Sequence, residues 1–227
     1  MIKDNLILLR DKIRRAAEKS NRRAEDIILV CVTKDRAPCQ ISEVIEAGVT
    51  DIGENKVREA ALKYKNIENE VNWHLVGHLQ TNKVKEAIQI FDMIHSLDSI
   101  KLAAAIDKEA GKIGKVTKVL LQVNVSAEET KFGVEPAHLF EILSEVSKFK
   151  NLNICGMMTI APLVDDAAKV RPYFKNTKEL FDKAKSVKLN NVDMKYLSMG
   201  MSQDFEAAIE EGANMVRIGT AIFGPRS

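Results

Sequence analysis

The sequence has few cysteines and no excess of charge of either sign. Its three cysteines, Cys31, Cys39 and Cys155, form no CxxC pair, which is typical of a reduced, cytosolic protein. Lysine and arginine number 34 against 32 aspartate and glutamate residues, so the net charge of +2 indicates neither nucleic acid nor an anionic membrane as a partner. No apolar run approaches the roughly 20 residues that span a bilayer. We therefore expect a cytoplasmic protein.

Motifs of several common enzyme classes are also missing. There is no GxGxxG or GxxxxGK[ST] segment for nucleotide phosphates and no GxSxG segment for acyl transfer. His74 and His78 are four residues apart, but VNWHLVGHLQ has the pattern of a strand followed by a loop, so a zinc site is disfavoured. His74 is predicted to be a partnered histidine of the core. Cys31 and Cys155 lie inside apolar runs and are predicted to be core residues rather than nucleophiles.

The sequence does contain a regular alternation of apolar runs and amphipathic segments. Apolar residues at helical spacing predict an N-terminal helix over residues 1–20. Helical segments follow most of the apolar runs; one extends from Pro38 to Gly48, with proline in its first turn and glycine after its last. The predicted strands are Ile27–Thr33, Thr50–Gly53, Val71–Val76, Met93–Leu97, Val119–Val125, Ile154–Met158, Lys195–Met199 and Met215–Ile218.

Strands that alternate with helices are joined by right-handed crossovers and form a parallel sheet. Eight of them in 227 residues fit a (β/α)8 TIM-type barrel, at the short end of its size range. The same alternation permits an open, doubly wound sheet, but eight strands are many for an open sheet of this length and its nucleotide fingerprints are missing. We predict an α/β protein with one barrel domain over residues 1–227, on which the helix over residues 1–20 packs as an addition.

Polar residues follow the predicted strands at the point where each strand ends. Lys34 comes directly after the first strand and Asn55 after the second. Ser198 lies at the end of the seventh strand, and Arg217 lies on the eighth. Because the chemistry of such barrels takes place at the carboxyl ends of the strands, we expect these side chains to meet at one mouth.

The loops after the last two strands have the features of a phosphate site. In LSMGMSQDFEAAIEEG, Ser202 stands where a helix N-cap is expected, near unpaired backbone N–H groups and the positive end of the helix dipole. In VRIGTAIFG, Gly219 lets the backbone approach a ligand and Thr220 adds a hydroxyl. Loops at these positions hold phosphate in many barrel enzymes. Taken alone, Ser202 is equally compatible with a simple helix cap.

Lys34 has two interpretations from the residues alone. A lysine held at a barrel mouth loses hydration, which lowers its pKa and makes its amine a nucleophile toward an aldehyde. Alternatively, Lys34 only extends to solvent from the strand end. With a phosphate site across the barrel, the first interpretation requires a ligand that carries both an aldehyde and a phosphate. Pyridoxal 5′-phosphate carries both. A phosphorylated carbonyl substrate of a Schiff-base aldolase is the other candidate.

Seven segments together resemble the pyridoxal phosphate homeostasis protein family: VTK, DIGENKVREA, WHLVGHLQTNK, IHSLDS, VNVSAEETKFGV, GMMTIAP and LSMGMSQDFEAAIEEGANMVRIGTAIFG. They occur in this order from about residue 27 to residue 224, and the last is long and specific. Members of this family look like the N-terminal barrel domain of bacterial alanine racemase standing alone. The resemblance implies a (β/α)8 barrel and a cytosolic carrier or regulator of free pyridoxal 5′-phosphate, rather than an enzyme.

Carried over to this chain, the resemblance implies that Lys34 forms a reversible Schiff base with the cofactor. It places the cofactor phosphate at Ser202, Gly219 and Thr220. It also places Arg217 either against the pyridine nitrogen, as in the racemase, or near the phosphate.

Three further positions belong to the predicted site with less definite roles. Asn55 and Met157, together with its neighbour Met158, match motif positions of the family. Ser198 lies where it would reach the cofactor ring. The predicted cofactor-binding residues are therefore Lys34, Asn55, Met157, Ser198, Ser202, Arg217, Gly219 and Thr220.

The chain departs from alanine racemase at positions that turnover needs. We expect it to lack the second, β-rich domain whose tyrosine is the opposing base, and Pro38 stands where the racemase has a phosphate-binding tyrosine. An arginine at the pyridine nitrogen, as implied for Arg217, keeps that nitrogen unprotonated and weakens the cofactor as an electron sink. We therefore expect binding without turnover, with apo forms of pyridoxal phosphate-dependent enzymes as candidate partners. A racemase-like enzyme and a Schiff-base aldolase are the alternatives.

Overall fold

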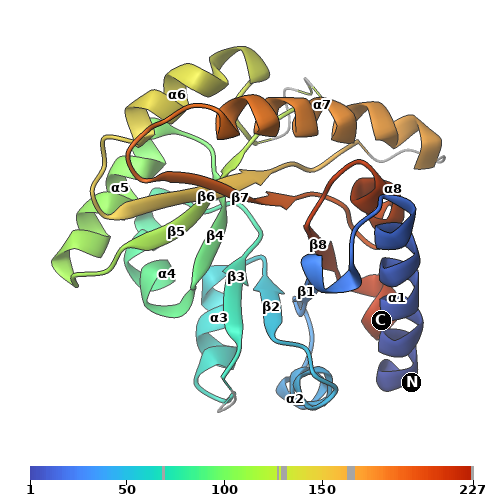
Figure 1. Cartoon of the computed structure of the whole chain (residues 1–227). Coiled ribbons are helices and arrows are strands. Elements are labelled where there is room, and N and C mark those ends of the chain that lie inside the picture. Colours follow the sequence, from blue (N-terminus) through green and yellow to red (C-terminus); the bar gives the residue numbers. More distant parts are fainter. Residues whose placement is uncertain (68–69, 127, 129–131, 163–166, 226–227) are drawn as a thin grey trace.

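The computed structural model describes residues 1–67, 70–126, 128, 132–162 and 167–225. In these residues eight parallel strands form a closed barrel in chain order, and the last strand pairs with the first (Figure 1). The strands are β1 (Ile28–Val32), β2 (Asp51–Glu54), β3 (Asn72–Leu75), β4 (Met93–Leu97), β5 (Thr117–Gln122), β6 (Leu152–Met158), β7 (Val192–Ser198) and β8 (Met215–Ile218).

Helices connect the strands and cover the outside of the barrel (Figure 1). The α-helices are α1 (Ile2–Lys19), α2 (Pro38–Glu46), α3 (Val57–Tyr64), α4 (Val84–Ile90), α5 (Ile100–Lys112), α6 (Leu139–Val146), α7 (Ala167–Lys185), α8 (Phe205–Glu210) and α9 (Thr220–Phe223). Short 3₁₀ helices lie at Ala24–Asp26, Thr81–Lys83 and Pro136–His138. Among the helices described here, none is both long and apolar enough to cross a membrane.

The closed ring confirms the predicted (β/α)8 barrel over the open sheet. Closure depends on β1 and β8, which pair in parallel register from Ile28 with Met215 to Cys31 with Ile218; in an open sheet these strands would be unpaired edges. Strand ends differ from the prediction by up to three residues. The run predicted to extend to residue 125 ends at residue 122, because Val123 leaves the sheet ladder and forms an isolated bridge with the loop after β5.

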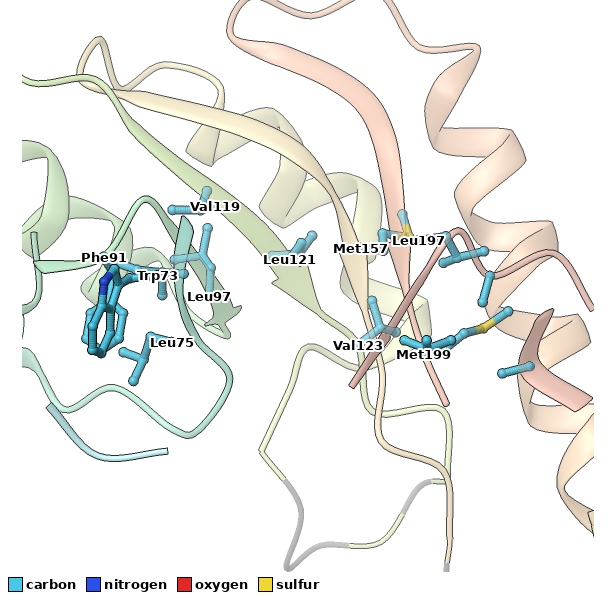
Figure 2. Packing of buried hydrophobic residues seen from close by; sticks show 14 of the residues in the cluster. Trp73, Leu75, Phe91, Leu97, Val119, Leu121, Val123, Met157, Leu197 and Met199 are labelled. Atoms are coloured by element: carbon cyan, nitrogen blue, oxygen red, sulfur yellow. The ribbon is translucent and has the colours of Figure 1, made fainter. Parts of the chain in front are cut away.

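Alternate residues of the strands face two separate apolar layers, as expected where a strand has one face inside a barrel and one outside. The interior layer consists of Val30, Val76, Met93, Leu120, Cys155, Met158 and Met215. The outer layer lies between the strands and the helices, and Figure 2 shows part of it, including Trp73, Leu75, Phe91, Met157 and Leu197. Burial of these two layers stabilises the barrel and fixes which face of each strand points inward.

Helix α1 packs on the barrel as an addition to the eight βα units. Its buried residues Leu6, Leu9, Ile13 and Ala16 recur at helical spacing and form one stripe that contacts α8 and α9. Asn5 Nδ2 also donates a hydrogen bond to the Ile222 carbonyl oxygen at 2.8 Å. The N-terminal helix was therefore predictable from its apolar period. That residues 1–227 form one domain stays a prediction.

Candidate functional site

A cavity of about 1100 Å³ opens at the carboxyl ends of the strands. Its walls come from β1, from β8, and from the segments that follow β1, β2, β3, β6, β7 and β8. Six residues that the sequence predicts for the site line it together: Lys34, Asn55, Ser202, Arg217, Gly219 and Thr220. This is the face on which barrel proteins of this fold bind their ligands, so the expected mouth corresponds to a real cavity.

The backbone on both sides of Lys34 is held by the side chains of α3. Lys63 Nζ donates to the Thr33 carbonyl oxygen at 2.7 Å, and the Asp35 backbone N–H donates to Glu59 Oε1 at 2.6 Å. Asp35 has a φ of 59°, a left-handed conformation that turns the chain sharply away from β1. Lys34 is partly buried at this turn. Its main chain is therefore fixed before any ligand arrives.

Lys63 is the centre of a compact ionic network beneath this turn. Its Nζ lies 2.7 Å from Glu54 Oε1 and 2.6 Å from Glu59 Oε1, and Thr33 Oγ1 donates to the same Glu54 oxygen at 2.5 Å. Glu54 is fully buried, and its Oε2 has no hydrogen-bond partner among the residues that the structure describes. Burial raises the pKa of Glu54, against the hydrogen bonds from Lys63 and Thr33. We call Thr33, Glu54, Glu59 and Lys63 the α3 network.

The loops after β7 and β8 meet at the cavity wall. Ser202 Oγ accepts a hydrogen bond from the Ala221 backbone N–H at 3.3 Å, which ties the two loops together. The prediction that Ser202 caps a helix is wrong, because α8 starts only at Phe205 and Asp204 stands at its N-cap. Asp204 Oδ1 accepts instead from the Met201 backbone N–H at 2.5 Å and closes the turn that presents Ser202. Burial raises the pKa of Asp204.

Two glycines allow these loops to pass close to their neighbours. Gly200 has a φ of 94°, and a Cβ there would lie 2.6 Å from the Ala208 Cβ atom. A Cβ on Gly219 would lie 3.1 Å from the Val32 carbonyl oxygen. The sequence predicts that Gly219 lets the backbone approach a ligand, which stays a prediction; the close approach that the structure shows is to the end of β1.

Arg217 lies at the inner end of the cavity. It is 5% exposed, and its Nη1 donates to Ser198 Oγ at 2.6 Å while its Nη2 donates to the Thr159 carbonyl oxygen at 2.8 Å. Burial lowers the pKa of Arg217 to about 10, although the nearby Asp204 carboxylate opposes the shift. The guanidinium therefore remains a cation and a hydrogen-bond donor at neutral pH.

Ser198 and Met157 lie away from the cavity wall. Ser198 is fully buried and bridges Arg217 to His95. Met157 belongs to the outer layer, where it is paired in register with Leu197 (Figure 2), whereas its neighbour Met158 faces the barrel interior. Because adjacent strand residues point to opposite faces, a shift of one residue decides whether a methionine lies inside or outside the barrel.

Several residues of the cavity were not predicted from the sequence. Arg36 lines the wall, donates to the Gly224 carbonyl oxygen at 2.8 Å and lies over the Phe223 ring at 5.2 Å. Gln203 and Asp204 follow Ser202 on the wall. A signal was present, because all three lie within two residues of Lys34 or Ser202. Their side chains were overlooked because loop residues have no periodicity that indicates their direction.

Cys31, Cys155 and His74 are buried and are not among the residues that line the cavity. Cys31 and Cys155 are buried, as predicted, and burial raises the pKa of both thiols, that of Cys31 to about 12, so neither is a ready thiolate. His74 is the partnered interior histidine that the sequence predicts, with ring nitrogens 2.9 Å from His95 and 2.9 Å from Asp51. Within the described ranges, no group of three or more candidate ligands would hold a metal ion.

The chain matches known protein families over almost its whole length. Residues 5–227 match the family model described as alanine racemase, N-terminal domain. A protein of Aquifex aeolicus named pyridoxal phosphate homeostasis protein is 43% identical over 217 residues, which cover 95% of this chain and 94% of that protein. A protein of the same name from Escherichia coli K12 is 36% identical over 230 residues, 99% of this chain and 97% of that protein.

Solved structures of similar proteins have the same barrel fold. The structure of PipY from Synechococcus elongatus with pyridoxal phosphate bound is 34% identical, with a TM-score of 0.83 over 99% of this chain and all of that chain. Alanine racemase from Clostridium difficile is 19% identical with a TM-score of 0.73; this chain covers 60% of it, a likeness that shows the fold alone. The barrel, its carboxyl-end cavity and these relatives place the chain in the alanine racemase N-terminal domain family, among the pyridoxal phosphate homeostasis proteins.

Proposed function

We propose that this protein binds pyridoxal 5′-phosphate in the cavity at the carboxyl ends of the strands and serves in the intracellular homeostasis of that cofactor. The observation that carries the proposal is the position of Lys34, which shares one cavity with the two joined loops after β7 and β8. The names of the relatives and the cofactor-bound PipY structure support the same conclusion. The cofactor supplies an aldehyde that condenses reversibly with an amine.

The residues of the cavity fit the ring and the phosphate of pyridoxal 5′-phosphate. Volumes of about 300–1000 Å³ are usual for small-molecule sites, so a cavity of about 1100 Å³ admits the cofactor and solvent. Apolar side chains of Val32, Val76 and Ile160 provide a wall for the ring, and Arg36 and Arg217 are cations that favour an anionic ligand. The wall therefore combines apolar surface with charge of the sign that a phosphate needs.

We assign the covalent contact to Lys34. Lys34 would hold the cofactor through its amine, the group that condenses reversibly with an aldehyde with loss of water. Because the main chain on both sides of Lys34 is held by Lys63 and Glu59, the amine is presented from a fixed base. Asn55, in the segment after β2, also lines the cavity, and we assign it a contact with the cofactor beside Lys34.

We assign the phosphate to the two joined loops and the ring nitrogen to Arg217. Hydroxyls of Ser202 and Thr220 and the backbone around Gly219 are donors grouped on one part of the wall. Arg217 reaches the cavity from inside the barrel, held by Ser198. Among the described residues of the wall the carboxylate is that of Asp204, which accepts from the Met201 backbone N–H. The ring nitrogen thus has an arginine rather than an acid assigned to it. Met157 is not part of this proposed site.

We propose a carrier role rather than turnover, because no tyrosine is placed to act as an opposing base. Tyr64 packs edge-on against Trp73 at 5.4 Å, Tyr173 packs with the outer layer, and Tyr196 packs with the interior layer. None of the three lines the cavity. Apo forms of pyridoxal phosphate-dependent enzymes in the cytoplasm are the proposed recipients. A racemase-like activity is the second candidate, favoured only by the shared barrel fold.

The test is the visible absorption spectrum of the purified protein with added pyridoxal 5′-phosphate, before and after borohydride. We expect a yellow band that borohydride removes, with the cofactor fixed to the peptide that contains Lys34. Lys34→Ala should abolish fixation, and Lys175→Ala, on the exposed face of α7, should leave it intact. A protein that stays colourless, or is labelled equally in Lys34→Ala, contradicts the proposal. Exchange of the α-proton of a labelled amino acid with solvent would favour the racemase alternative.

A further inference from the structure

A chain of hydrogen bonds crosses the barrel interior from the cavity to the opposite rim. Arg217 Nη1 donates to Ser198 Oγ at 2.6 Å, and Ser198 Oγ lies 3.2 Å from His95 Nδ1. His95 Nε2 lies 2.9 Å from His74 Nδ1, and His74 Nε2 lies 2.9 Å from Asp51 Oδ1. Asp51 is the first residue of β2, at the amino end of the barrel. Side chains from five strands are thereby joined in one line, which we call the interior relay.

The interior relay is almost completely removed from solvent. Ser198 and His95 are fully buried, and His74 and Arg217 are 3% and 5% exposed. Only the Asp51 side chain, which is 14% exposed, reaches the surface. A buried polar group that loses its partner costs free energy, so each of these hydrogen bonds depends on the next.

With both histidines neutral, the contacts allow a single arrangement of the relay protons. The Asp51 carboxylate only accepts, so His74 Nε2 donates to it and His74 Nδ1 accepts from His95 Nε2. His95 Nδ1 is then an acceptor and takes the proton of Ser198, whose Oγ accepts from Arg217. Each donor has one acceptor, and the direction runs from the Arg217 cation to the Asp51 anion. Both histidines therefore carry their proton on Nε2.

We propose that the interior relay positions the Arg217 guanidinium for the ligand, with Asp51, His74, His95 and Ser198 as positioning residues. Ser198 accepts from one guanidinium nitrogen and the Thr159 carbonyl oxygen accepts from the other, which fixes the plane of the group. Because its single proton points at His95 Nδ1, the Ser198 hydroxyl is held in the rotation that turns its lone pairs toward the Arg217 guanidinium. The orientation of a cavity residue is thus set from the opposite end of the barrel.

The charges around the relay favour this direction. Burial, and after it any positive charge on the neighbouring His74 or Arg217, holds the pKa of His95 well below its usual value, so its ring stays neutral. At the rim, burial opposes ionisation of Asp51, but hydrogen bonds from His74 and Thr50 outweigh it and lower the pKa of that carboxyl. At the cavity end, the charge that acts on Arg217 is that of Asp204. A protonated His74 would donate toward His95 and reverse every bond of the relay up to Ser198.

The first test uses the full chain without cofactor, so that it does not depend on the proposed function. The protein, labelled with ¹⁵N at histidine and arginine, is studied by NMR at neutral pH. We expect the His74 and His95 rings to carry a proton on Nε2, that of His95 to carry none on Nδ1, and the Arg217 side-chain N–H signals to exchange slowly with water. Asp51→Asn should shift the ring signals of His95, which does not contact residue 51, and speed the Arg217 exchange. A His95 proton on Nδ1, or unchanged His95 and Arg217 signals, would overturn the proposal.

The second test measures cofactor affinity and rests on the proposed function. His95→Leu removes the acceptor of Ser198 and should weaken binding of pyridoxal 5′-phosphate about tenfold, the effect of one lost charge-assisted hydrogen bond. His95→Gln keeps one acceptor and one donor and should retain affinity within about threefold. Asp51→Asn, far from the cavity, should weaken binding about fivefold. His138→Gln, at an exposed histidine before α6, is the control and should change nothing.

The variants remain informative if one of them folds poorly. Far-UV circular dichroism checks His95→Leu, and His95→Gln and Asp51→Asn keep the polarity of their sites. Equal affinity in the wild type, Asp51→Asn and His95→Leu would overturn the positioning role. If the wild type itself binds no pyridoxal 5′-phosphate, the proposed function is wrong, and the histidine and arginine signals of the first test decide the relay alone.

Discussion

Two buried polar networks flank the cavity, and they are built in different ways. The α3 network beneath Lys34 is compact and ionic, with Lys63 Nζ within 2.7 Å of two carboxylates. The interior relay behind Arg217 is a line of four hydrogen bonds whose middle members, Ser198, His95 and His74, are neutral in the assigned proton arrangement. One network concentrates charge at a point, and the other keeps its two charges apart at the ends.

The difference lies in what each network holds. The α3 network bonds to main-chain atoms, the Thr33 carbonyl and the Asp35 N–H, so it fixes the course of the backbone through Lys34. The interior relay ends on the guanidinium of Arg217, so it fixes a side chain. We therefore expect damage to the α3 network to lower the free energy of unfolding most. Damage to the relay should be expressed more strongly in ligand binding.

The largest effect is expected for Lys63→Met. Removal of this cation leaves Glu54 buried without its partner, which should lower the unfolding free energy by about 3–5 kcal/mol. Urea denaturation at pH 7 measures the change. Lys195→Met, which breaks an exposed pair with Asp193, is the matched control and should leave the unfolding free energy almost unchanged. Equal losses in the two variants would mean that the α3 network contributes no more than a surface pair.

A smaller loss is expected for His95→Leu. Leucine fills a similar volume, but the Ser198 hydroxyl and His74 Nδ1 lose their partners, at a cost of about 2–3 kcal/mol in unfolding free energy. The same urea titration gives the value. A loss greater than that of Lys63→Met would reverse the comparison and make the relay the main stabilising network.

A pH titration separates the two networks further. His95 has a pKa well below 6.5 in the folded protein, so below pH 6.5 the unfolded chain takes up a proton that the folded protein does not. The contribution of His95 is therefore complete above pH 6.5 and is lost as the pH falls, by at most about 1.4 kcal/mol per pH unit. The stability difference between wild type and His95→Leu should shrink from pH 7 to pH 5.5. A constant difference would show that His95 titrates alike in both states.

The smallest stability effect is expected for Asp51→Asn. The side chain is partly exposed and asparagine still offers an acceptor to His74, so the unfolding free energy should fall by about 1 kcal/mol or less. Thermal unfolding, followed by circular dichroism, measures it. Combined with the weaker cofactor binding expected for this variant, a small loss would separate positioning from stability. A loss above about 3 kcal/mol would place Asp51 among the main supports of the fold.

Much of the fold and part of the site follow from local sequence signals. The apolar period located α1 and the strands within a few residues. The strand ends drew attention to Lys34 and Gly219, although the residues alone left extension of Lys34 to solvent as an equal alternative. Met157 shows the limit of a pattern with period two, because an error of one residue places a side chain outside the barrel instead of inside it. Ser202 shows a limit of capping signals, because Asp204, two residues later, is the N-cap of α8.

The interior relay was hidden for a different reason. Each of its contacts joins side chains on different strands, and Ser198 and His95 are 103 residues apart in the sequence. The residues of the relay carry no common motif, and a lone histidine in an apolar run is usually a core residue. Only the closed barrel, which brings β2, β3, β4, β7 and β8 around one interior, makes them neighbours.

The close approach of Gly219 to the end of β1 has a consequence for the order in which the protein is made. Lys34 leaves the ribosome early, whereas the loop that packs beside it belongs to the last strand of the barrel. The cavity therefore does not exist on a growing chain until β8 has emerged and paired with β1. Contacts between such distant segments also form late and slowly in folding. A nascent chain thus carries Lys34 without the loops of the proposed phosphate site beside it, and these loops reach Lys34 only when the ring closes.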